Sequence, residues 1–74
     1  MTYDALTYVR SLLVKDIDNL YEKSIDAMKA YVQAKRNGEP KEVLADLWDK
    51  KQEAYAIESK ARDVLKDFDS HNFR

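Results

Sequence analysis

Apolar residues recur every three or four positions through two long segments of the chain, a spacing that lines them along one face of an α-helix. In the first segment they are Leu6, Val9, Leu13, Ile17, Leu20, Tyr21, Ile25, Met28, Tyr31 and Val32. In the second they are Val43, Leu44, Leu47, Ala54, Ile57, Ala61, Val64, Leu65 and Phe68. The pattern predicts two helices, and where the second series is interrupted Lys50 or Lys51 lays its aliphatic stem across the gap.

A short segment with strong helix breakers separates the two series. It holds the only glycine and the only proline of the chain, Gly38 and Pro40. Gly38 suits the left-handed position that ends a helix, and Pro40 suits the beginning of the next one. Thr2 is the expected N-cap of the first helix. We therefore predict helix 1 over about residues 3–37, a turn at 37–40, helix 2 over about 41–68 and a frayed tail at 69–74.

Folding back at Gly38 sets a register between the two predicted helices, with residue i opposite about residue 78 minus i. This register pairs Tyr31 with Leu47, Ile25 with Ala54, Tyr21 with Ile57, Ile17 with Ala61 and Leu13 with Leu65. Large side chains next to small ones fill the space between closely packed helices. The predicted fold is an all-α antiparallel two-helix hairpin, and we expect residues 1–74 to form a single domain.

The predicted hairpin has more apolar surface than one stripe on each helix can bury. Eight of residues 3–14 are Tyr, Ala, Leu or Val, and two further aromatic residues lie beside the apolar series of helix 2. The predicted interaction surface consists of Tyr3, Leu6, Tyr8, Val9, Leu12, Leu13, Trp48 and Tyr55. Large exposed apolar patches mark interaction sites. We expect a partner there, either a second copy in a four-helix bundle or a larger protein; the alternative is that these are isolated surface aromatics above charged neighbours.

Composition supports a protein that depends on association. The chain has 74 residues and no cysteine, so disulfides are excluded, and a core of this size supplies only about 3–5 kcal/mol. Thirteen Lys and Arg balance fourteen Asp and Glu, which argues against a nucleic-acid binder because phosphate binding needs an unbalanced basic stripe. No apolar run reaches the length of a membrane span and no signal peptide is evident. We expect a soluble cytoplasmic protein with no membrane contact.

The strongest candidate for chemistry lies close to the C-terminus. Asp67, Asp69 and His71 offer three possible metal ligands, and Ser70 between them completes the residue types of a hydrolase triad. Consecutive residues cannot align a nucleophile, a base and an orienting acid, and a frayed tail cannot hold zinc geometry. We therefore expect no catalytic residue, no metal, no cofactor and no enzymatic activity. The predicted function is a small helical regulator, inhibitor or adaptor.

The C-terminal half also carries a family resemblance. Pro40, then Leu44 and Ala45, Ile57 to Ser59, Leu65 to Asp67 and finally Asn72 to Arg74 resemble the second helix of type III secretion needle subunits. The resemblance implies a hairpin that polymerises into a hollow filament through its exposed aromatic flanks. The chain departs from that pattern because it lacks an apolar C-terminal extension and is more charged through helix 2. A structural subunit of a helical assembly is thus the alternative function, and a dimeric nucleic-acid-binding hairpin is the second alternative.

Overall fold

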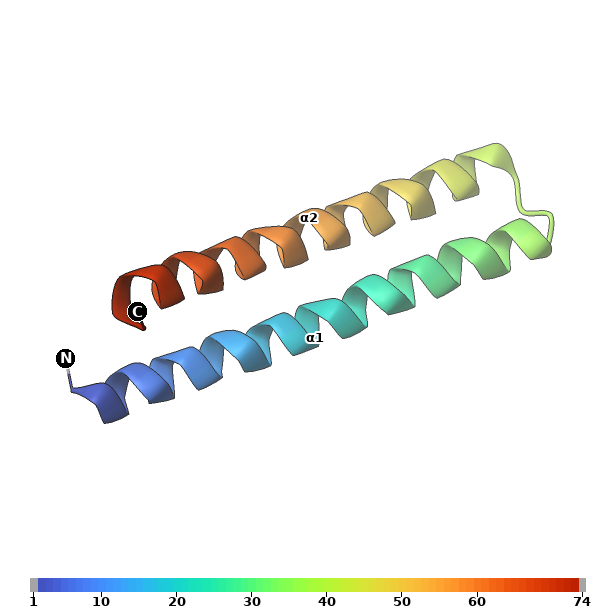
Figure 1. Ribbon diagram of the computed structural model, residues 1–74. Helices are drawn as coiled ribbons and strands as arrows, with labels where there is room; N and C mark the ends of the chain where they lie inside the picture. The colour runs from blue at the N-terminus through green and yellow to red at the C-terminus, as the bar shows by residue number, and fades with distance from the viewer. Residues whose placement is uncertain (1, 74) are drawn as a thin grey trace.

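Two long helices pack side by side in antiparallel directions. The computed structural model describes residues 2–73, in which α1 (Tyr3–Arg36) and α2 (Lys41–Asn72) form a hairpin with the start of α1 and the end of α2 at one end of the rod (Figure 1). The rod measures 54 × 15 × 14 Å and its radius of gyration is 16.8 Å, against about 11 Å for a globular chain of this length. The predicted all-α antiparallel hairpin is confirmed, while Met1 and Arg74 of the predicted domain lie outside the described residues.

The turn between the helices is built from hydrogen bonds that satisfy the last carbonyls of α1. Gly38 has a φ of 70°, the left-handed conformation that only glycine adopts without strain. Its N–H donates to the carbonyl of Lys35 at 3.2 Å, and the N–H of Glu39 donates to the carbonyl of Ala34 at 3.1 Å. This pair of bonds is the Schellman motif. Pro40 then caps α2, which begins at Lys41 as predicted.

The outer ends of the helices differ in how well the sequence predicts them. At the start of α1 the predicted N-cap is confirmed, because the backbone N–H of Ala5 donates to Thr2 Oγ1 at 3.3 Å. At the other end, α2 continues as helix to Asn72, so the frayed tail predicted for residues 69–74 is wrong for 69–72; Arg74 lies outside the described residues. The extension is held by contacts to α1, through Asp69 and through Phe73, whose ring lies 5.9 Å from that of Tyr3.

Many of the buried and half-buried side chains recur at a seven-residue spacing, as in a coiled coil. We call these positions the seam. On α1 they are Leu6, Leu13, Ile17, Leu20, Ser24, Ala27, Tyr31 and Ala34, and on α2 they are Leu44, Leu47, Lys51, Ala54, Glu58, Ala61, Leu65 and Phe68, all buried or half-buried. From Leu13 to Ala34 the predicted register places each seam residue of α1 opposite one of α2, whereas Leu6 falls opposite Asn72. Two observed contacts, between Tyr31 and Trp48 and between Arg10 and Asp69, lie one residue from that register.

Several residues of the predicted apolar series lie outside the seam. Tyr21, Val32, Val43, Ile57 and Val64 are exposed, so the predicted packing of Tyr21 against Ile57 inside the hairpin is wrong. The small residues Ser24, Ala27 and Ala34 take the seam positions instead. The prediction followed apolar side chains in steps of four and thereby drifted from the seven-residue repeat. Of the two candidate lysines, Lys51 is the half-buried one and Lys50 is exposed.

Candidate interaction surface

Two rows of residues flank the seam, one along each side of the rod. With Ile17 on α1 and Leu44 on α2 taken as a positions of the seven-residue repeat, the e and b positions of both helices share one side and the g and c positions share the other. Between residues 14 and 33 of α1 and 45 and 64 of α2, the first side, here called the aromatic edge, comprises Val14, Asp18, Tyr21, Ile25, Met28, Val32, Ala45, Trp48, Gln52, Tyr55, Ser59 and Arg62. The second, the charged edge, comprises Asp16, Asn19, Lys23, Asp26, Ala30, Gln33, Asp46, Lys50, Glu53, Ile57, Lys60 and Val64.

Contacts between the helices support this division. On the aromatic edge, Tyr55 of α2 reaches α1, where its hydroxyl lies 3.6 Å from Met28 Sδ. On the charged edge, a groove of 220 Å³ is lined from both helices, by Lys23 on α1 and by Lys50 and Ile57 on α2 among others. Both α1 and α2 therefore contribute to each edge.

The two edges differ sharply in charge. Two of the twelve residues of the aromatic edge are charged, Asp18 and Arg62, whereas seven of the twelve on the charged edge are charged. Arg62 is already paired within the chain, since its Nε lies 2.8 Å from Glu58 Oε2. The charges of the other edge alternate in sign, which suits a solvated surface and gives no basic stripe for nucleic acid. Between these levels of the rod, the aromatic edge therefore has fewer charged groups than the charged edge to interact with water.

Aromatic and cationic side chains are packed together on the turn-proximal half of the aromatic edge. The ring of Tyr31 meets that of Trp48 edge-on, with 5.4 Å between centroids. Lys51 Nζ lies 4.1 Å from the Trp48 ring centre and 5.4 Å from that of Tyr55, distances at which a cation is attracted to the ring face. These contacts hold the rings in place although Trp48 is 41% and Tyr55 36% exposed. Tyr21, 50% exposed on the same edge, extends the surface along α1.

A polar cluster crosses the seam beneath this edge. Ser24 is fully buried, and its hydroxyl lies 2.9 Å from Glu58 Oε1 and 2.7 Å from the carbonyl oxygen of Tyr21. A hydroxyl has one proton, so it donates to these two acceptors in turn. Hydrogen bonds from Arg62 first, and then from Ser24, lower the pKa of Glu58 below its usual value. The predicted register places Ser24 opposite Ala54, so its hydrogen bond to Glu58 joins seam positions about one helical turn apart. The bond helps to specify the register, because a shifted register would separate Ser24 from Glu58.

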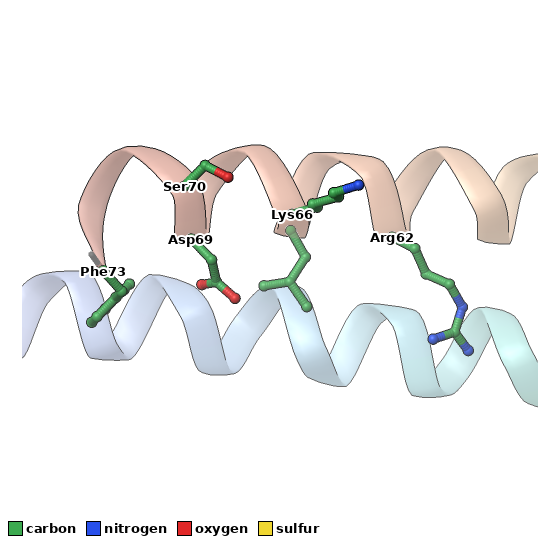
Figure 2. Close-up of a pocket in the computed structure, with 6 residues that line it drawn as sticks. Arg62, Lys66, Asp69, Ser70 and Phe73 are labelled. Atoms are coloured by element: carbon green, nitrogen blue, oxygen red, sulfur yellow. The ribbon is translucent and has the colours of Figure 1, made fainter.

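The open end of the rod is closed by a second set of contacts. Arg10 of α1 donates two hydrogen bonds to Asp69 of α2, at 2.9 and 3.1 Å, and this hydrogen-bonded carboxylate raises the pKa of Arg10. Beside the pair lies an open depression of 430 Å³ lined by α2. Figure 2 shows Asp69 and Phe73 extending from α2 toward α1 along it. Asp69 and Arg62, which line the depression, are already engaged in ion pairs, and the Arg10–Asp69 pair joins the helix ends.

The eight residues of the predicted interaction surface do not form one surface. Leu6 and Leu13 occupy the seam, where they are half-buried. Val9 and Leu12 fall on the side of the charged edge, Tyr8 points away from α2, and Tyr3 packs on Phe73 at the open end. Trp48 and Tyr55 lie on the aromatic edge at the other half of the rod. Sequence reasoning therefore missed Tyr21, Ile25, Met28 and Val32 as neighbours of Trp48 and Tyr55, and counting heptad positions is the signal that groups them.

The described part of the chain gives little support for a metal site or a membrane span. Within residues 2–73 no group of three or more His, Cys, Asp or Glu side chains is arranged to hold a metal ion. His71 Nδ1 lies 2.7 Å from the carbonyl oxygen of Asp67 in the last turns of α2. Neither described helix has the length and apolar content required to cross a bilayer. No protein-family model, no curated protein and no solved structure matches this chain.

Proposed function

We propose that this chain is a non-enzymatic helical module that binds protein through its aromatic edge, in the cytoplasm, as a regulator or adaptor. The observation that supports this most is the contrast between the two sides of the rod: exposed Tyr21, Trp48 and Tyr55 share a surface with two charges among twelve residues. Protein-binding surfaces are enriched in tyrosine and tryptophan and depleted of charge at their centre. The proposal replaces the N-terminal flank predicted from the sequence with this edge.

The fixed positions of the aromatic side chains on this edge favour binding. Trp48 is held by Tyr31 and Lys51, and Tyr55 by Lys51 and Met28. Side chains that already occupy fixed positions lose little conformational entropy when a partner covers them. A few aromatic anchors of this kind supply most of the affinity of an interface.

Site-specific photocrosslinking tests the proposal. Benzoylphenylalanine is placed at Tyr21 on the aromatic edge or at Ile57 on the charged edge, two positions that are 50% and 47% exposed and at the same level of the rod. Irradiation in the cells that make the protein is expected to give discrete protein adducts from position 21 and few from position 57. A chain that forms no protein adduct from position 21 does not bind through this edge.

A structural subunit of a helical assembly is a second candidate, favoured by a separate observation. The side of the rod that carries the charged edge also exposes Val43, Ile57 and Val64 along α2, so apolar side chains are available on both sides of the rod. Two different surfaces can join copies head to tail into an open assembly, whereas a closed dimer uses one surface twice. Negative-stain microscopy of the purified chain distinguishes them, since only the assembly gives filaments.

A further inference from the structure

We infer that the partner of the aromatic edge is a second copy of this chain, and that two hairpins meet edge to edge as a four-helix bundle. The inference rests on the proposed function, because it names the occupant of the same surface. A two-helix layer covered on one side by an equal layer is the arrangement of helical bundles. The two-fold axis brings Tyr21, Trp48 and Tyr55 of one copy against the same side chains of the other.

The surface area of the single hairpin supports a partner of this size. The chain exposes 5812 Å², whereas a compact monomer of its 8.7 kDa exposes about 4,700 Å². The excess is about 1,100 Å², and each partner in an interface of standard size buries about 800 Å². Among the described residues only Ile17, Ala34 and Ser24 are buried, and none of them is in α2. A second hairpin on the aromatic edge would bury surface that one hairpin cannot cover.

The charge pattern identifies a second copy as the matching surface. A strongly basic or acidic partner would find few groups to pair with on the aromatic edge. Asp18 forms no ion pair with another described residue, Arg62 is bound to Glu58, and the ammonium of the seam residue Lys51 lies over the rings of Trp48 and Tyr55. An equally charge-poor surface brings few like charges together. The same edge on another copy has that property, and the charged edge of another copy does not.

Sedimentation equilibrium of the whole chain over a wide concentration range tests the inference. The expected mass at high concentration is twice 8.7 kDa. Tyr21→Lys places a charge at both halves of the two-fold interface and is expected to weaken dimerisation at least about hundredfold. Ile57→Lys, at the same level on the charged edge, is the matched control and is expected to leave the dimer intact. Gln52→Lys, an exposed polar position on the aromatic edge, repeats the test without removing an apolar side chain, and circular dichroism verifies that each variant is helical.

The outcomes separate this inference from the proposed function. A mass of one chain at every concentration, an open polymer, or a dimer lost in Ile57→Lys and retained in Tyr21→Lys and Gln52→Lys would each overturn self-association through the aromatic edge. If the chain is monomeric while position 21 crosslinks to a different protein, the proposed function stands and the inference that the partner is a second copy is wrong. If position 21 gives no adduct of any kind, both are wrong.

Discussion

Replacing Ile17 with alanine tests whether the seam carries the stability of the hairpin. Ile17 is 4% exposed, so the substitution removes three buried carbon atoms, worth about 2.4 kcal/mol at about 0.8 kcal/mol per methylene. The cavity that remains raises the expected decrease in the free energy of unfolding to about 3 kcal/mol. One core of this size supplies only about 3–5 kcal/mol. The melting temperature is therefore expected to fall by about 12–24 °C, at about 4–8 °C per kcal/mol for a chain of this length.

The matched control is Ile57→Ala, which removes the same atoms from a side chain that is 47% exposed. Because about half of that surface is already in water, the expected loss is about 1 kcal/mol. Melting is followed by circular dichroism at one fixed protein concentration, since self-association raises the melting temperature with concentration. Equal shifts for Ile17→Ala and Ile57→Ala would refute the assignment of the seam.

Two further predictions concern the turn and the polar cluster. Gly38→Ala forces a residue with a side chain into a left-handed φ of 70°. Thermal melting is therefore expected to show that the free energy of unfolding falls by about 1 kcal/mol; an unchanged melting temperature would mean that the turn relaxes to another conformation. The pKa of Glu58 is lowered in the folded chain. The contribution of its carboxylate to the free energy of unfolding is therefore fully present above the usual pKa of 4.5, and it is lost as the pH falls through the lower pKa of the folded chain. Urea titrations on either side of that window are expected to show a smaller acid-induced loss for Glu58→Gln than for the natural chain, and equal losses would contradict the assignment.

The turn and the register could be predicted because their signals are local. Gly38 and Pro40 are unique in the sequence and have backbone requirements that other residues do not meet, so they locate the turn. Once the turn is placed, the equal rise of two helices fixes which residues lie at the same level. The end of α2 was not predictable in this way, because residues 69–72 are held in the helix by contacts to α1, through Arg10 and Tyr3, that lie far away in the sequence.

The side of each helix that faces its partner was harder to predict, because the seam is not the most apolar face. Ser24, Lys51 and Glu58 occupy seam positions, whereas Tyr21, Ile57 and Val64 are exposed. An apolar pattern read by itself assigns these two groups the wrong way round. The seven-residue spacing of Leu6, Leu13, Leu20, Ala27 and Ala34 identifies the seam of α1. Alanine is common on exposed helix faces as well, so its place in that series is easily overlooked.

The polar seam and the charge-poor edge are connected by one energetic argument. Placing Ser24 and Glu58 between the helices specifies their register but contributes less to stability than apolar side chains of similar size. Aromatic residues that would strengthen the seam lie instead beside it, at Tyr21, Trp48 and Tyr55. In the proposed bundle these residues become part of a shared core, so the hairpin gains from association the burial that its own seam lacks. Under that proposal the concentration dependence of the melting temperature should disappear in Tyr21→Lys and persist in Ile57→Lys.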